Sequence, residues 1–307
     1  MVKDKDTEGF EEKVLAEDSF AYFFKNGWDH NVRLMAANVL FIVFNIPAIV
    51  LAYLMSVLFI PSLSASLGWD SFIRVVTEEG NSEVSFQLYF LLVIFCITVL
   101  VPSLLFTVGP FQAGFAQVYK GIRTNTSESL MSDFKRGIKE NWKRSLGAML
   151  IGIVITFIII LSIGFYSGFA SITGIVISSV FKILLIAFIL VQNFVYNLMA
   201  ATDLKLGKLY KNALLFIFLR FGPCFAIGLL LIIVYIALPF FLLMSASYLT
   251  LGIFIFLYSF VLISWMQYFM SFYTGRLIDR YVSDAKEKSD YSGDNELELK
   301  GNEEKEL

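Results

Sequence analysis

Six long apolar segments occupy most of this 307-residue chain, and none of them contains an aspartate or a glutamate. A helix needs about 20 residues to cross a hydrocarbon core of about 30 Å, and each segment is at least that long. Inside lipid only helices and closed barrels satisfy their own backbone, and continuous apolar segments indicate helices. The predicted fold class is therefore all-α, a polytopic membrane bundle with six transmembrane helices at residues 34–60, 86–108, 147–170, 174–200, 222–246 and 249–273.

The composition supports a membrane protein and excludes several classes of site. Hydrophobic residues make up 57% of the chain, against about 45–50% in a soluble domain. A net charge of −2 gives no reason to expect a nucleic-acid partner. The single histidine, His30, cannot build a zinc site by itself. Cys96 and Cys224 lie inside apolar segments, where we expect small packing residues. We therefore expect no metal and no cofactor.

Lysine and arginine are concentrated in alternate connections of the predicted bundle. The connection 61–85 has a single basic residue, Arg74, beside four acidic ones, whereas 109–146 has seven basic residues. Basic residues mark the cytoplasmic side of a membrane protein. We therefore expect both termini to be cytoplasmic, together with the other basic connections. The basic segments are the first 33 residues, 109–146, 201–221 and the tail from Gly275.

The chain divides into three parts. Residues 1–33 mix charges with aromatic rings and are predicted to form a cytoplasmic, interfacial segment. Residues 34–274 form the predicted transmembrane domain. Residues 275–307 are polar and net acidic with no apolar periodicity, which predicts a disordered cytoplasmic tail.

A basic amphipathic stretch precedes the third predicted span. Phe134, Ile138 and Trp142 recur at four-residue spacing, and cations cover the other faces. A helix of this kind lies in the headgroup layer, with its rings inward and its cations near anionic lipid. Two interpretations stay open: the helix only shapes the connection, or it is a docking or lipid surface. The cations of this candidate surface are Lys135, Arg136, Lys139, Lys143 and Arg144.

The basic stretch has a counterpart later in the chain. Residues 134–155 align without gaps with residues 210–231, at an offset of 76. Arg144 then corresponds to Arg220, and each copy joins a surface stretch to a new span. Because both copies have the same orientation, they predict a parallel internal repeat with its axis near the membrane normal.

Amide side chains inside the predicted spans form a candidate polar cavity. Asn38 and Asn45 share a face of the first helix, and Asn193 and Asn197 share a face of the fourth. Gln267 lies in the last span. Buried amides in lipid need partners, so these side chains either link helices to one another or line a cavity for a neutral ligand such as a sugar.

Two Gly-Pro pairs near the predicted cytoplasmic face are candidate hinges. They are Gly109 with Pro110, and Gly222 with Pro223. Proline has no backbone donor and marks a helix boundary, so each pair is either a fixed turn or a hinge.

A further pattern consists of Arg33-Leu34, Asn38, Asn45, Pro47, Gly109-Pro110, Ala113, Val118, Arg123, Asp133-Phe134, Lys139, Asn141-Trp142-Lys143, Leu146 and Lys211-Asn212-Ala213. This pattern resembles the YesL-like family of bacterial integral membrane proteins, whose shared domain has no established molecular function. The resemblance covers approximately residues 18–275, but the stretch of about 60 residues between Pro47 and Gly109 and the acidic tail are departures from its shorter members. It implies a bacterial cytoplasmic membrane, and a role beside carbohydrate uptake with a sugar transporter or sensor kinase subunit as partner.

Two functional hypotheses follow, and neither requires a catalytic residue. The first is a non-enzymatic accessory or regulatory membrane protein that acts through its cytoplasmic basic helix and tail. The alternative is a carrier or channel for a small neutral solute, which uses the buried amides. An enzyme is disfavoured because membrane-embedded catalysis usually needs an ionisable group at depth. The oligomeric state stays open.

Overall fold

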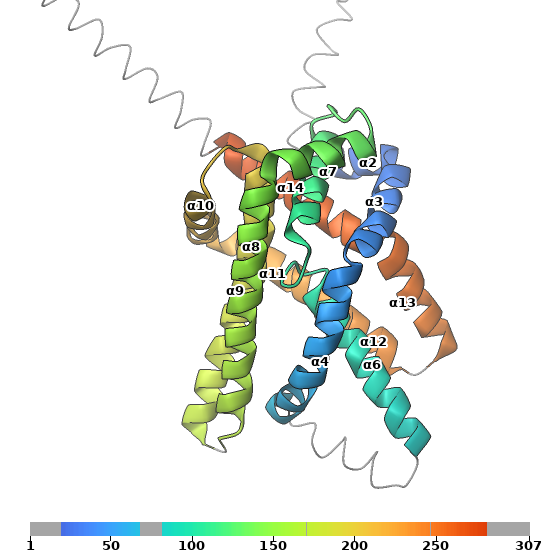
Figure 1. Cartoon of the computed structure of the whole chain (residues 1–307), viewed down its shortest axis with the longest axis vertical. Helices are drawn as coiled ribbons and strands as arrows, with labels where there is room; N and C mark the ends of the chain where they lie inside the picture. The colour runs from blue at the N-terminus through green and yellow to red at the C-terminus, as the bar shows by residue number, and fades with distance from the viewer. Residues whose placement is uncertain (1–19, 68–81, 170, 246, 281–307) are drawn as a thin grey trace, which may run out of the picture.

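The computed structural model describes residues 20–67, 82–169, 171–245 and 247–280, and all regular elements in these ranges are helical. The all-α prediction is therefore confirmed (Figure 1). In chain order the helices are α2 (Phe20–Asp29), α3 (Asn31–Phe44), α4 (Ile46–Leu67), α6 (Ser82–Leu100), α7 (Gly109–Arg123), α8 (Leu130–Ser167), α9 (Ile172–Ala201), α10 (Leu206–Leu219), α11 (Phe221–Ile232), the π-helix η1 (Ile233–Ala237), α12 (Leu238–Met244), α13 (Tyr248–Phe260) and α14 (Leu262–Ile278).

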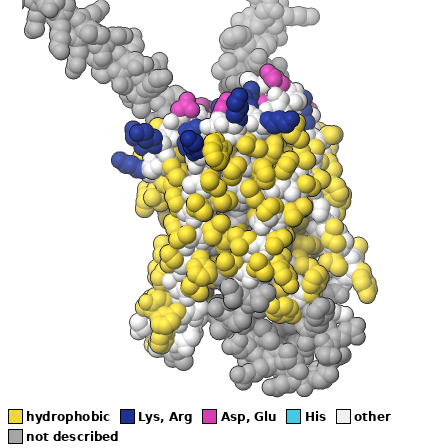
Figure 2. Space-filling view, in the orientation of Figure 1, with side chains coloured by type: hydrophobic (Ala, Val, Ile, Leu, Met, Phe, Trp, Pro, Cys, Tyr) yellow, Lys and Arg dark blue, Asp and Glu magenta, His cyan; other side chains and the backbone are white. Residues whose placement is uncertain are grey.

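Several helices have the length and composition of membrane spans. Within the described residues, α8, α9 and the continuous segment Phe221–Met244 are each long and apolar enough to cross a membrane. The pairs α3–α4 and α13–α14 are bent by 59° and 44°, and counting each pair as one span raises the number to five. Figure 2 shows apolar side chains covering the flank of the bundle. This is the surface that lipid, and not water, would cover.

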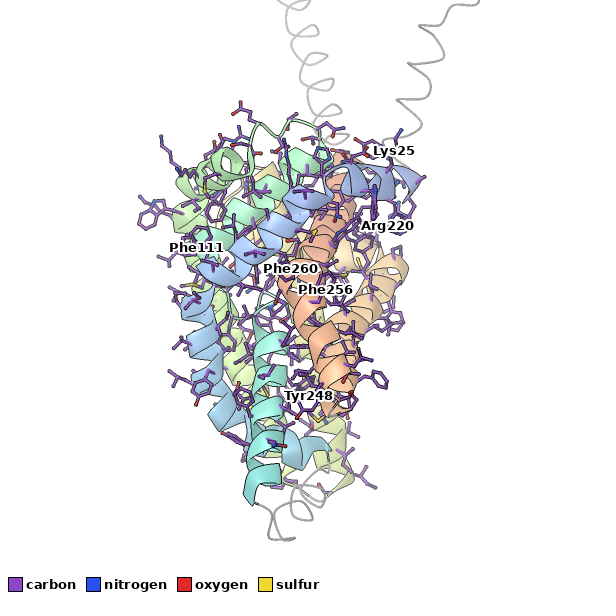
Figure 3. The ribbon with its side chains drawn as sticks, turned by 90° about the vertical axis from the view of Figure 1, so that its right-hand side faces the viewer. Lys25, Phe111, Arg220, Tyr248, Phe256 and Phe260 are labelled. Carbon is purple, nitrogen blue, oxygen red and sulfur yellow. The ribbon has the colours of Figure 1, made fainter. Side chains whose placement is uncertain are left out.

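Charged side chains gather at one end of the bundle, which we call the charged end (Figure 2). The helices α2 and α14, at the two limits of the described chain, reach this same end (Figure 1). The turn that joins α8 to α9 lies at the opposite end. Figure 3 shows Lys25 toward the charged end and Tyr248 toward the other. Residues 1–19, the centre of the predicted outer connection at 68–81, and the tail from 281 lie outside the described residues.

The predicted surface helix and the third span are one unbroken helix. The sequence suggested an amphipathic segment followed by a separate span at 147–170, but α8 runs continuously for 38 residues. Its first turns lie across the charged end before the helix continues along the bundle (Figure 1). The predicted inward row of rings is also divided: Phe134 is buried, whereas Trp142 is 51% exposed. Phe134 packs against Phe44 and Phe115, with ring centroids 4.8 Å apart in both cases.

The internal repeat is not confirmed, because the two aligned segments have different local structures. Arg144 lies inside the continuous helix α8. Its counterpart Arg220 lies at a break between α10 and α11, with φ −126° and ψ 47°. The alignment therefore matches residues in a helix interior with residues at a helix boundary.

Glycines allow α7 and α8 to pack at backbone contact. A Cβ atom on Gly137 would lie 2.7 Å from the carbonyl oxygen of Ala113 and 2.9 Å from the Cα atom of Gly114. Both of these neighbours are backbone atoms of α7, which cannot rotate away. A Cβ atom on Gly114 would similarly meet the ring of Phe134 at 2.6 Å. Small residues at a helix crossing permit this close approach in membranes.

This contact makes a specific prediction about stability. Gly137→Ala should destabilise the protein by about 1–3 kcal/mol, since the new methyl group forces the two backbones apart. Unfolding of the purified protein in detergent would measure the change. Gly252→Ala in α13 is the matched control, because a Cβ atom there has no neighbour within 4 Å. Equal stability of the two variants would contradict the contact.

Candidate functional site

Asn38 joins the two halves of the broken helix α13–α14. Its Nδ2 donates to the carbonyl oxygen of Tyr258 at 2.7 Å, near the end of α13. Its Oδ1 accepts from the backbone N–H of Ser264 at 2.8 Å, in the first turn of α14. Helix ends leave such groups without partners inside the helix. One fully buried amide therefore satisfies backbone groups on both sides of the break.

Asn45 lies at the other break, between α3 and α4. Its Oδ1 accepts from the backbone N–H of Val108 at 2.9 Å, and its Nδ2 donates to the carbonyl oxygen of Phe41 at 2.9 Å. Val108 is the N-cap of α7 and closes the non-helical segment 101–108. Irregular backbone at membrane depth requires such partners within the protein. Asn45 therefore connects two irregular segments that are 63 residues apart in sequence.

The two asparagines of α9 have unequal roles. Asn193 is buried, and its Nδ2 donates to the carbonyl oxygens of Ile189 at 2.9 Å and Ser103 at 3.4 Å. Ser103 precedes Leu104, which has a positive φ of 68° that is costly for a leucine. Asn197 is half-buried and donates to its own helix, at the carbonyl oxygen of Asn193. Only Asn193 therefore supports an irregular segment.

Gln267 has a partner that the sequence analysis missed. Nε2 of Gln112 in α7 donates to Oε1 of Gln267 in α14 at 2.7 Å, and both residues are at most 3% exposed. The other polar atoms of the pair, Gln112 Oε1 and Gln267 Nε2, have no hydrogen-bond partner among the described residues. An unpaired buried polar group costs about 1–3 kcal/mol of folding free energy, so these two atoms destabilise the core.

The glutamine pair belongs to a polar seam between α7 and α14. We use this name for the pair Gln112–Gln267 together with the pair Tyr119–Ser264, whose hydroxyl oxygens are 3.0 Å apart. Gln112 and Tyr119 are seven residues apart, so they share a face of α7. The seven-residue spacing was visible in the sequence, but 109–146 was interpreted there as a cytoplasmic connection between spans. Only the structure shows that α7 is packed among the other helices, with most of its residues buried.

The five cations of the candidate basic surface separate into two groups. Lys135, Lys139 and Lys143 are exposed on the first turns of α8. Arg136 is paired at 2.6 Å with Asp133, a fully buried carboxylate that also accepts from Ser127. The three lysines are therefore the part of this surface that is directed to solvent.

Arg144 binds backbone carbonyl groups directly after the C-terminal end of α9. Its guanidinium donates to the carbonyl oxygens of Thr202 at 3.1 Å and Leu204 at 3.0 Å. Lys120 has a similar role, since its Nζ donates to the carbonyl oxygen of Ala200 at 2.9 Å. Burial, with a contribution from the nearby Arg123, lowers the pKa of Lys120. Cations are favoured at a helix C-terminus, where carbonyl groups have no partner within the helix.

The two candidate hinges have opposite surroundings. Gly109 begins α7, and a Cβ atom there would collide with the backbone carbonyl of Ser145 in α8. Pro110 follows it in the first turn, where a proline lacks no needed donor. Gly222 and Pro223 begin α11 directly after the break at Arg220, and a Cβ atom on Gly222 would meet nothing within 4 Å. Gly109 is therefore held by packing, whereas the space beside the Cα atom of Gly222 is open.

Metal-binding and thiol chemistry receive no support from the described residues. No group of three His, Cys, Asp or Glu side chains lies close enough there to hold a metal ion. Cys96 and Cys224 are buried and form no disulfide.

Comparison with protein-family models, with curated proteins and with solved structures finds no match.

The Asn38 bridge can be tested by comparing two asparagines. Asn38→Leu leaves the Tyr258 carbonyl and the Ser264 N–H without partners, so we expect a loss of about 1–3 kcal/mol for each group. Asn197→Leu is the control, with a loss below about 1 kcal/mol, because its acceptor already belongs to a helix. Unfolding in detergent measures both. A loss in Asn38→Leu no greater than in the control would refute the bridge.

Proposed function

We propose that this chain is a non-enzymatic, accessory or regulatory membrane protein that binds a partner at its charged end. The observation that carries this proposal is the row of exposed lysines, Lys135, Lys139 and Lys143, beside the exposed ring of Trp142. An aromatic ring among cations provides both apolar and charged contacts for a protein or a headgroup surface. The buried amides, by contrast, are largely engaged by the protein itself.

The proposed topology has six spans with both termini in the cytoplasm. The structure supplies three to five candidate spans, and α6, which contains the apolar stretch Tyr89–Leu100, would be the sixth. Both ends of the described chain reach the charged end (Figure 1). An even number of crossings is consistent with that arrangement, and the basic residues at the charged end favour a cytoplasmic position for it.

The carrier alternative receives less support from the amides on which it was based. Asn38, Asn45 and Asn193 each bond to backbone groups of irregular segments, and Asn197 bonds to its own helix. A solute site needs side chains that can exchange their partners for the solute. Within the described chain, Gln267 is the one member of this set with a fully buried polar atom that has no hydrogen-bond partner.

The kind of partner is proposed from the resemblance alone. The YesL-like pattern suggests a bacterial cytoplasmic membrane and a sugar transporter or sensor kinase subunit as partner. Nothing in the described residues favours catalysis. The only fully buried carboxylate among them, Asp133, is neutralised by Arg136.

Topology can be tested with single cysteines in a variant that lacks Cys96 and Cys224. We expect Tyr248→Cys to react with a membrane-impermeant maleimide in intact cells, because Tyr248 is 96% exposed at the end away from the charges. Glu128→Cys, in an exposed position at the charged end, should react only after permeabilisation. The reverse pattern would overturn the orientation.

Docking can be tested by replacing Lys135, Lys139 and Lys143 together with glutamine. Exposed charges change stability by about 0.5 kcal/mol at most, so membrane levels should stay normal. Recovery of a transporter or kinase subunit from native membranes should fall several-fold. The wild-type complex should also weaken in raised salt, because surface charges are screened within about 10 Å at 0.1 M.

The matched control for docking is the pair Lys208→Gln and Lys211→Gln. These lysines are exposed at the same end but on α10. Recovery of the same partner should be unchanged in this control. Equal recovery with the α8 variant and the control would remove the basis for docking on α8.

A further inference from the structure

The helix α10 has one apolar face inside the bundle and a second one outside it. The inner face consists of Leu209, Ala213 and Phe216, which recur at spacings of four and three residues and are at most 2% exposed. A helix that is apolar around most of its circumference is typical of burial in protein or lipid, so the outer face needs a cover. The outer residues are half-exposed or more: Leu214 at 47%, Leu215 at 47%, Phe218 at 75% and Leu219 at 50%.

Lysines occupy the first turns on the outer side of α10. Lys208, Lys211 and Leu215 recur at spacings of three and four residues, so they lie on one stripe of the helix. Both lysines are exposed, and neither pairs with a carboxylate of the described residues. Residues 204–278 contain no aspartate or glutamate, so α10 has no carboxylate of its own. The outer stripe is therefore basic in its first turns and apolar in its last.

The helix α10 lies at the boundary between the charged end and the apolar flank. Its start is held at the charged end, because Lys120 and Arg144 bind carbonyl groups of the segment 200–204 that leads into it. Figure 1 shows α10 at the side of the bundle, close to that end. Arg220 directly follows α10 and lies farther from the charged end than Lys25 (Figure 3).

The outer apolar face leads directly into a candidate membrane span. The span Phe221–Met244 begins immediately after Arg220. Its first turns expose the rings of Phe221 and Phe225, at 66% and 58%, and the two ring centroids are 6.2 Å apart. These rings belong to the part of the span that lipid would cover, and Phe218 lies only three residues before Phe221. This continuity favours lipid as the cover of the outer face of α10.

We propose that α10 binds an anionic phospholipid of the leaflet at the charged end. The ammonium groups of Lys208 and Lys211 bind its phosphate, and Leu215 and Phe218 contact its acyl chains. Lysine side chains can extend from an apolar surface to the headgroup layer, where anionic lipid attracts them. The proposal requires that the bundle is embedded in a membrane. It does not require the docking of a partner on α8, which uses different lysines.

The test measures which lipid contacts α10 in vesicles. Full-length Phe218→Trp protein is reconstituted into mixtures of phosphatidylcholine and phosphatidylglycerol, with brominated acyl chains on only one of the two lipids. Bromine quenches a tryptophan that it touches, so the signal that remains after subtraction of the wild-type protein reports lipid at residue 218. We expect a preference of about fivefold for phosphatidylglycerol. The preference should fall in raised salt, because salt screens surface charges.

A second tryptophan position and two lysine variants locate the preference. Phe256→Trp should show none, because Phe256 is 54% exposed on α13, a helix without charged residues. Lys208→Gln with Lys211→Gln should remove the preference at residue 218. Lys208→Arg with Lys211→Arg should keep it, since arginine preserves the charge.

The matched control for charge is Lys135→Gln with Lys139→Gln. It removes the same two charges from exposed positions at the charged end, but on α8, and should leave the preference at residue 218 unchanged. An equal loss in this control would mean a general attraction to the charged end and would overturn a site on α10.

Four further outcomes would also overturn the proposal. They are equal quenching by the two lipids at residue 218, an equal preference at residue 256, a preference that survives the Lys208→Gln and Lys211→Gln changes, and no quenching by either lipid. The last outcome would mean that protein, such as a second copy of the chain, covers the outer face. If the glutamine variant does not reconstitute, the salt series decides, since a preference that salt leaves unchanged is not electrostatic. Partner recovery is measured separately, so the docking proposal and this one can fail independently.

Discussion

The structure depends on satisfying backbone polar groups where apolar helices are interrupted. Two pairs of helices are bent at breaks, and residues 101–108 have no regular helix at all. Each interruption releases N–H and carbonyl groups that lipid cannot satisfy. Asn38 and Asn45 supply the missing partners at the two breaks, and Asn193 supports the non-helical segment. Without these amides, the backbone groups at the interruptions would lose their hydrogen-bond partners.

The position of α7 follows from these interruptions. Because residues 101–108 leave the helical path, α7 begins inside the bundle, and its glycines bring it to backbone contact with α8. The same arrangement places Gln112 and Tyr119 against α14. The polar seam is thus a consequence of a close glycine contact on one side of α7 and of the bent helix α13–α14 on the other.

The charged end combines structural cations with exposed ones. Lys120 binds the carbonyl of Ala200 in the last turn of α9, and Arg144 binds the carbonyls of Thr202 and Leu204 directly after that helix. Arg136 neutralises Asp133. These cations are committed to the fold. Lys135, Lys139 and Lys143 are exposed and remain suited to contact with lipid or a partner. Sequence spacing alone could not separate the two groups, because all five cations occur within ten residues of one helix.

The sequence by itself determined the fold class and the membrane character, because length and apolarity limit a lipid-embedded chain to helices. It also identified buried amides, since Asn38 and Asn193 stand out in apolar segments. Only the tertiary structure decided their partners, which lie up to 226 residues away. The tertiary structure also showed that α8 continues through Arg144 and that α7 is packed inside the bundle. Breaks, close glycine contacts and the Gln112–Gln267 pair depend on how distant helices meet, and no local pattern contains that information.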